Sequence, residues 1–433
     1  MTTPSVPGDD PVADASVEPA QGEDEVRVVT EPADGLGLVV ADPAGYREAV
    51  AALASGTGPV AIDAERAHGF RYSNRAYLLQ LRREGAGTVL IDPIALAPGT
   101  GPADFGDLDE LIIDEEWIIH AAHQDLPCLV ELGLVPGHIF DTELAGRLLG
   151  YPRVNLGTLL EEFFGVRLLK EHSAADWSKR PLPRDWLNYA ALDVELLIDL
   201  RNALAEQLAD AGKEEWARQE FEFLATHSTD PPDVRPDPWR RTSGIHRIRN
   251  RRGLAVVAEL WRARDEIARR TDRTPGRILS DAAISEIASL KSPTAQAIRD
   301  LPVMNRRGAR RYEANWVAAV ERAMALPEAK LPPLHRHADG PPQQARLWTS
   351  RDPAAAARLA AAREALTGRA AALNLPVENL LTPDYLRRLA WRPPEPIDET
   401  TVDTFLDTLG ARRWQREIVV PLITPLLRSP RGQ

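Results

Sequence analysis

The segment Val60-Ala61-Ile62-Asp63-Ala64-Glu65 carries the strongest indication of the fold of this chain. It is an apolar run of the strand type that carries two carboxylates, two residues apart. Because alternate residues of a strand point to the same face, we expect the side chains of Asp63 and Glu65 to project together from one face of a sheet.

Two later segments supply further acidic groups. Tyr189 and Asp193 stand at positions i and i+4 of a stretch whose apolar residues recur at helical spacing, so both are predicted to lie on one helix face. Residues 117–122 predict a strand that runs into a helix beginning near Gln124 and Asp125. This leaves the Asp125 carboxylate at the end of a strand, where open α/β sheets place their ligands.

Four carboxylates and a tyrosine together predict a two-metal nuclease site. Oxygen-preferring cations such as Mg²⁺ or Mn²⁺ select carboxylates, and two such ions suit displacement at phosphorus. The predicted ligands of the two ions are Asp63, Glu65, Asp125 and Asp193. Tyr189 is expected to orient the attacking water, because a phenol with a pKa of about 10 is a poor base at neutral pH. Taken singly, Asp63 and Glu65 could belong to an exposed strand face, Asp125 could be a helix N-cap, and Tyr189 with Asp193 could be a surface pair.

The order of these residues resembles the ribonuclease D branch of the 3′–5′ exonuclease superfamily over residues 35–225. Asp63-Ala64-Glu65 matches its first motif, Asp125 ends its second, and Tyr189 with Asp193 forms the third, Tyr-x-x-x-Asp. The flanking segments 77–81 and 176–182 agree with this. The resemblance implies an RNase H-like α/β fold with a mixed sheet flanked by helices. It also implies metal-dependent hydrolysis from a 3′ end that releases nucleoside 5′-monophosphates.

The sequence departs from the family pattern inside the first motif. Ala64 stands where Thr is common, and Arg66 stands where a hydrophobic residue usually follows. These changes put the binding of the terminal nucleotide in doubt but remove no metal ligand. Lys179 and Arg180 precede the third motif and are candidates to contact the substrate backbone. For Arg180 a buried structural ion pair is an equal alternative. We expect no chemical role for His120, His123 or Asp141.

Composition shifts divide the 433 residues into several parts. Two Pro-rich breaks separate three folded regions, and the first residues are acidic and of low hydrophobicity, which predicts disorder. The predicted parts are a disordered tail at 1–30, an exonuclease domain at 31–228, a linker at 229–239, an HRDC domain at 240–330, a linker at 331–345 and a second, diverged HRDC-like domain at 346–430.

Charge is segregated between these parts. The chain has a net charge of −12, residues 31–230 hold 16 basic against 34 acidic residues, and residues 240–330 hold 20 against 10. We therefore expect the middle region to bind the polyanion. Its basic clusters lie at 240–241, 246–252 and 306–311.

The middle region is predicted to be all-helical. The segments 261–265, 277–281 and 290–294 resemble the HRDC domain, which implies nucleic-acid binding, and Ser280 or Asp281 is expected to cap a helix.

These observations predict a 3′–5′ exoribonuclease that acts on RNA 3′ ends, such as those of tRNA precursors or other structured RNA. A DNA exonuclease in repair and a catalytically weak RNA-binding scaffold remain as alternatives. One cysteine and no run of about 18 apolar residues predict a cytoplasmic protein without a membrane span.

Overall fold

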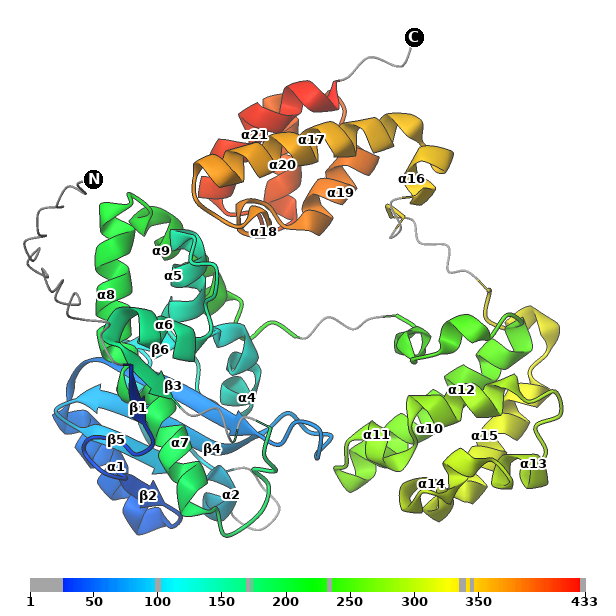
Figure 1. Ribbon diagram of the computed structural model, residues 1–433, viewed down its shortest axis with the longest axis horizontal. Helices are drawn as coiled ribbons and strands as arrows, with labels where there is room; N and C mark the ends of the chain where they lie inside the picture. The colour runs from blue at the N-terminus through cyan, green and yellow to red at the C-terminus, as the bar shows by residue number, and fades with distance from the viewer. Residues whose placement is uncertain are drawn as a thin grey trace, which may run out of the picture.

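The computed structural model describes residues 26–97, 103–168, 172, 174–231, 236–334, 340–342 and 346–428. Figure 1 shows three bodies along the chain, which we call the N-terminal domain (26–231), the middle domain (236–334) and the C-terminal domain (346–428). The N-terminal domain is α/β and the other two are helical, as the sequence predicts.

A mixed six-stranded sheet forms the centre of the N-terminal domain, with the order β2-β5-β4-β3-β6-β7. β3 pairs with β4 in antiparallel and with β6 in parallel orientation, β4 and β5 are antiparallel, and the outer pairs β2–β5 and β6–β7 are parallel. The strands are β2 (Leu38–Val40), β3 (Thr57–Arg66), β4 (Ala76–Glu84), β5 (Gly87–Ile91), β6 (Glu116–Ile119) and β7 (His138–Asp141).

The predicted disordered tail is wrong at its end. Residues 1–25 lie outside the described residues, but Arg27–Val29 forms strand β1, which pairs in parallel with β8 (Val166–Leu168). Val28 and Val29 are β-branched and favour this conformation, and Val29 packs against the hydrophobic core. The acidic composition therefore predicts too long a tail.

Helices cover both faces of the six-stranded sheet. α7 crosses the face that carries Asp63 and Glu65, while α1 and α3 pack on the opposite face around Val60 and Ile62. The helices are α1 (Pro43–Ser55), α2 (Pro93–Leu96), α3 (Gly106–Ile112), α4 (Leu126–Glu131), α5 (Thr142–Leu149), α6 (Leu156–Phe164), α7 (Arg184–Glu195), α8 (Leu197–Asp210) and α9 (Glu214–Thr226).

The middle domain packs around one long helix, α10 (Arg251–Thr271), whose apolar face meets α12 and α15. Ser280 caps α12 by accepting from the Ala283 amide, which confirms one of the two predicted caps. Trp239, counted at the end of the predicted linker, is buried in this core because its indole is large and apolar. The other helices are α11 (Pro275–Ile278), α12 (Asp281–Ser289), α13 (Ala295–Arg299), α14 (Arg307–Arg311) and α15 (Glu313–Ala325).

The C-terminal domain shares one continuous hydrophobic core with the N-terminal domain. Residues of α8 and α9 pack in the same cluster as residues of α17 and α21. The helices are α16 (Arg346–Arg351), α17 (Pro353–Ala372), α18 (Val377–Leu380), α19 (Pro383–Trp391), α20 (Glu399–Thr408) and α21 (Arg413–Leu427). Among the described residues, no helix has both the length and the apolar character needed to cross a membrane.

Candidate active site

Three of the four predicted metal ligands meet at the centre of the N-terminal domain. Asp63 and Glu65 project from β3, and Asp193 comes from α7, which crosses that face of the sheet. One carboxylate oxygen of each lies within 4.8 Å of the others. The strand alternation and the helical spacing read from the sequence thus bring these groups together as expected. A set made only of carboxylate oxygens fits a hard divalent cation.

Asp125 lies beside this cluster but outside it. It follows β6 and the short 3₁₀ turn Ala122–Gln124, at the start of α4, and is 5% exposed. Its carboxylate pairs with the Arg66 guanidinium at 3.4 Å, so the departure from the family pattern at Arg66 has a structural partner. The turn that places Asp125 is held by Asp141, whose carboxylate accepts from the amides of Ala121 and Ala122.

Burial governs the charge state of the acidic residues. It raises the pKa of Asp63 to about 6, against the lowering effects of the Ala64 amide and of Arg66. Burial, followed by repulsion between the neighbouring carboxylates, also raises the pKa of Glu65 and of Asp125 well above the usual range. The same two causes act on the pKa of Asp193. Among the residues that the structure describes, only Arg66 offsets the negative charge of the four carboxylates, so divalent cations bound there would stabilise their ionised forms.

Tyr189 is placed to donate a hydrogen bond and not to abstract a proton. Burial, followed by the charges of Asp193, Glu65 and Asp63, raises the pKa of its hydroxyl far above the usual value. A hydrogen bond from this hydroxyl lowers the pKa of Asp193. The phenol therefore stays protonated at neutral pH and can orient a neighbouring group.

Gln80 is a site neighbour that sequence reasoning missed. It lies directly opposite Asp63 in the β3–β4 register, so both side chains share one face of the sheet. It is fully buried, and neither atom of its amide has a hydrogen-bond partner among the described residues. A buried amide costs stability unless it is satisfied, which marks Gln80 as available to Asp63 or to water there. A lone Gln inside the apolar strand Tyr77–Leu81 was the available signal.

The contacts of Arg180 favour the structural alternative for this residue. Its guanidinium binds Asp92 through two nitrogens, at 2.5 and 2.8 Å, and donates to the carbonyls of Tyr77 and Trp177. Few of its donors are left for a substrate. Lys179 is exposed next to it, and its contact with substrate stays a prediction.

The three residues for which we expected no chemical role, His120, His123 and Asp141, lie outside the carboxylate cluster. His120 is bound to the Thr142 hydroxyl at 2.9 Å, and burial lowers its pKa to about 4. His123 is exposed. Asp141 caps α5 by accepting from the amides of Glu143 and Leu144. None of them belongs to the carboxylate cluster.

Three family models match successive parts of the chain. One described as "3′-5′ exonuclease" matches residues 39–209, "HRDC domain" matches 253–320, and "3′ to 5′ exonuclease C-terminal domain" matches 340–427. The C-terminal region, expected to be a second HRDC-like domain, therefore matches a model with a different description. The N-terminal domain is a 3′–5′ exonuclease domain.

Curated relatives named ribonuclease D extend this match beyond single domains. The protein of Gluconacetobacter diazotrophicus is 32% identical over 65% of this chain and 71% of its own length. The chain belongs to the ribonuclease D family. The ribonuclease D of Nitrobacter hamburgensis is 34% identical over 57% of this chain, and the chain spans 64% of the length of that relative.

Solved structures share the fold of most of this chain. A protein from Bifidobacterium adolescentis is 39% identical, with a TM-score of 0.85, and the match covers 93% of this chain and all of that one. Escherichia coli RNase D, described as an exoribonuclease involved in structured RNA processing, has a TM-score of 0.65 at 21% identity. That match covers 90% of this chain and 98% of the other and shows a shared fold.

Proposed function

We propose that this ribonuclease D family member is a 3′–5′ exoribonuclease that hydrolyses phosphodiester bonds at RNA 3′ ends, with tRNA precursors or other structured RNA as its substrates. The observation that carries the proposal is the convergence of Asp63, Glu65 and Asp193, whose carboxylate oxygens lie within 4.8 Å of one another. The family membership supports RNA as the substrate class.

Two divalent cations, Mg²⁺ or Mn²⁺, fit the donor set, with Asp63, Glu65, Asp125 and Asp193 as their ligands. When bound, such ions lower the pKa of water and offset the charge that develops on the leaving 3′ oxygen. If the Asp125 carboxylate turns from Arg66 to a cation, the Arg66 guanidinium becomes available to a phosphate oxygen. Arg66 would in this way serve the terminal nucleotide in place of a threonine hydroxyl, which Ala64 cannot offer.

Tyr189 and Gln80 complete the proposed site without changing charge. The Tyr189 hydroxyl keeps its proton and holds the attacking water in line with the phosphorus by a hydrogen bond. Gln80 lies opposite Asp63 on the same face of the sheet, and its unpaired amide would be available to the Asp63 carboxylate or to a water beside it.

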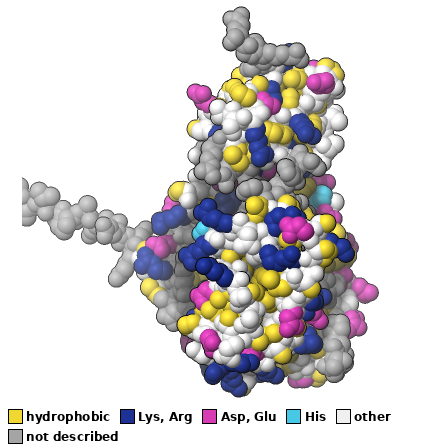
Figure 2. All heavy atoms as spheres, turned by 90° about the vertical axis from the view of Figure 1, so that its right-hand side faces the viewer, with side chains coloured by type: hydrophobic (Ala, Val, Ile, Leu, Met, Phe, Trp, Pro, Cys, Tyr) yellow, Lys and Arg dark blue, Asp and Glu magenta, His cyan; other side chains and the backbone are white. Residues whose placement is uncertain are grey.

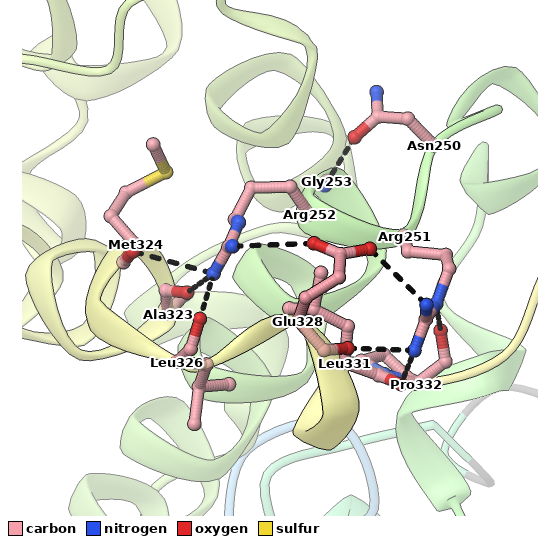
Figure 3. A network of polar contacts seen from close by, with 10 residues as sticks. All are labelled: Asn250, Arg251, Arg252, Gly253, Ala323, Met324, Leu326, Glu328, Leu331 and Pro332. Atoms are coloured by element: carbon pink, nitrogen blue, oxygen red, sulfur yellow. Dashed lines mark hydrogen bonds and ion pairs between the residues drawn. The ribbon is translucent and has the colours of Figure 1, made fainter.

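The RNA upstream of the 3′ end requires a basic surface, and the predicted cluster at 246–252 supplies only part of one. Arg251 and Arg252 turn inward: Arg252 donates to the carbonyls of Ala323, Met324 and Leu326 at the end of α15. Arg251 donates to those of Glu328 and Leu331, as Figure 3 shows. These two arginines bind the end of α15 and the chain that follows it, so their guanidinium groups are not free to bind phosphate.

Other arginines of the middle domain remain for the polyanion. The side chains of Arg249, Arg306 and Arg307 are exposed, and none forms an ion pair or hydrogen bond within the described part of the chain. Figure 2 shows basic side chains gathered on the face where this domain lies. A Cβ at Gly308 would lie 2.1 Å from the Arg277 carbonyl, so the backbone of α14, which carries Arg307, packs closely against α11. We propose that Arg249, Arg306 and Arg307 bind the phosphates of the RNA.

The proposal is tested with purified protein and its Asp63→Asn and Asp193→Asn variants on 3′-extended RNA with Mg²⁺ or Mn²⁺. We expect single-nucleotide shortening from the 3′ end and a loss of at least about a thousand-fold in rate for each variant, equivalent to about 4 kcal/mol. Glu84→Gln, an exposed acid on β4, is the matched control and should keep full activity.

Two outcomes would replace the proposal by its alternatives. Equal or faster digestion of a DNA strand of the same sequence would favour a DNA exonuclease. Tight RNA binding without metal-dependent cleavage, together with no Mn²⁺ binding in calorimetric titration, would favour the scaffold.

A further inference from the structure

The loop that joins β3 to β4 links the candidate site to the middle domain. This β3–β4 loop, residues 67–75, starts directly after Arg66, which pairs with Asp125. On its other side Arg71 donates to the Ser178 hydroxyl at 2.8 Å, and Ser178 donates to Asp176 at 2.5 Å. The segment around Ser178 leads into α7, which carries Tyr189 and Asp193. The loop thus continues the strand that carries Asp63 and Glu65 and contacts the segment that precedes α7.

Asp272 of the middle domain binds the backbone of this loop. It ends α10 in the left-handed conformation, with φ +45°, and its carboxylate accepts from the amides of Tyr72 at 3.2 Å and Ser73 at 2.8 Å. The Tyr77 hydroxyl, at the start of β4, reaches the same carboxylate at 3.4 Å. One side chain therefore gathers three donors from the exonuclease domain.

Further contacts surround this carboxylate. The Thr274 amide donates to the Phe70 carbonyl at 3.1 Å, and Arg277 donates to the Gly69 carbonyl at 2.9 Å with its guanidinium 4.1 Å from the Phe70 ring centroid. The Tyr72 hydroxyl bonds Asp265 at 3.1 Å. The Tyr72 ring also packs against the hydrophobic core of the middle domain. Most of these contacts are directional hydrogen bonds, which define the conformation of the loop.

We propose that Asp272 is a positioning residue, through which the middle domain holds the β3–β4 loop in the conformation that aligns Arg66 and the third-motif helix with the metal site. The inference rests on the proposed function and extends it. The middle domain then contributes to the rate of hydrolysis as well as to RNA binding. A basic domain that only held RNA would have no need to contact this loop through a carboxylate, which repels phosphate.

Asp272→Asn is the variant that tests this role. Asn tolerates the left-handed conformation, so the end of α10 is preserved, while the amide can accept through one oxygen only. Glu286→Gln is the matched control, because Glu286 is exposed in the same domain, has no side-chain partner among the described residues and loses the same charge. Arg277→Met is a second variant that weakens the loop contact from another residue.

Two substrates separate positioning from RNA grip. A dinucleotide lacks the upstream phosphates that a basic domain binds, whereas a 3′-extended RNA of tRNA size presents them. For Asp272→Asn we expect kcat on the dinucleotide to fall about 10-fold to 100-fold, since small misplacement of catalytic groups is costly, with KM changed little. Glu286→Gln should match the parent protein on both substrates.

Amide hydrogen exchange gives a readout independent of activity. The amides of Tyr72 and Ser73 should exchange faster in Asp272→Asn, and those of the sheet should not. Unchanged kcat on the dinucleotide, or a defect seen only as a raised KM on the long RNA, would overturn the inference. If the parent protein itself shows no metal-dependent cleavage, the proposed function fails. The exchange data then still decide whether Asp272 holds the loop.

Discussion

The exonuclease domain contacts its two helical neighbours in opposite ways. Towards the C-terminal domain it shares a hydrophobic core, in which Trp414 stacks on Trp216 with ring centroids 4.7 Å apart. Buried Glu220 accepts from the Trp414 indole at 3.0 Å and pairs with Arg412 at 2.8 Å. Towards the middle domain it offers the β3–β4 loop, whose contacts are mainly hydrogen bonds around Asp272, with the rings of Phe70 and Tyr72 packed beside them.

Two further contacts join the exonuclease domain to the C-terminal domain, one through Lys213 and one through Gly150. Lys213 donates to the carbonyls of Leu148, Leu373 and Asn374, which joins α5 to the end of α17. Gly150 ends α5 with φ +85°, and a Cβ there would lie 2.5 Å from Asn374. Only glycine fits both the conformation and the close approach.

The two helical domains therefore have different effects on the exonuclease domain. Apolar burial is large and non-directional, so the C-terminal contact contributes mainly stability. Hydrogen bonds are directional and contribute little net stability, so the middle contact defines geometry next to the site. Unfolding experiments and kinetics should therefore separate the two interfaces.

The largest expected effect comes from a pair of tryptophan substitutions. Trp414→Ala removes a side chain from the shared core and should destabilise the exonuclease and C-terminal domains together by about 3–5 kcal/mol. Trp316→Ala removes an equally buried side chain from the separate core of the middle domain. It should lower only a distinct middle-domain transition in calorimetry. A single transition shifted alike by both variants would refute the division.

A smaller loss is expected at the polar centre of the C-terminal contact. Glu220→Gln leaves Arg412 without its counter-charge and should cost about 2 kcal/mol in urea unfolding, since hydrogen bonds to charged groups contribute about 1.5–3. Its kcat on a dinucleotide should stay at the parent level. Asp272→Asn keeps one acceptor oxygen and should show the reverse pattern, a smaller loss of stability than Glu220→Gln and a reduced kcat. Equal loss of kcat in both would remove the contrast.

The smallest expected effect is a difference in pH response without metal. Burial raises the pKa of Asp63 from 3.8 to about 6, so the stability that its protonated form contributes below pH ~4 is lost as the pH rises through about 6. Burial alone would also raise the pKa of Asp272, but hydrogen bonds from Ser73 and Tyr72, with the charge of Arg71, lower it. Its contribution is therefore constant between about pH 5 and 8.

Calorimetry in EDTA tests this directly. The melting temperature of the exonuclease transition should fall between pH 5 and 7.5, while that of the middle-domain transition stays level. Mn²⁺ should abolish the fall, because it binds the ionised carboxylates. If the melting temperature of the exonuclease domain in EDTA does not change with pH, burial does not raise the pKa of these carboxylates.

Local periodicity predicted most of the catalytic cluster. Alternation in β3 put Asp63 and Glu65 on one face, and i to i+4 spacing put Tyr189 beside Asp193, because both patterns depend only on backbone geometry within one element. The charge pattern, in contrast, does not show which arginines of the basic cluster at 246–252 are free to bind phosphate. Arg251 and Arg252 look like phosphate ligands in sequence but bind carbonyls more than 70 residues away.

The fold class, the family, the acidic groups and the segregation of charge could be predicted from the sequence, since they follow from residue types, order and period. The contacts of each polar group became visible only in the folded structure. It paired Arg66 with Asp125 and Arg180 with Asp92, left Gln80 unpaired opposite Asp63, and brought Asp272 to a loop 200 residues away. Such contacts depend on how elements pack across the whole chain, and no local pattern encodes them.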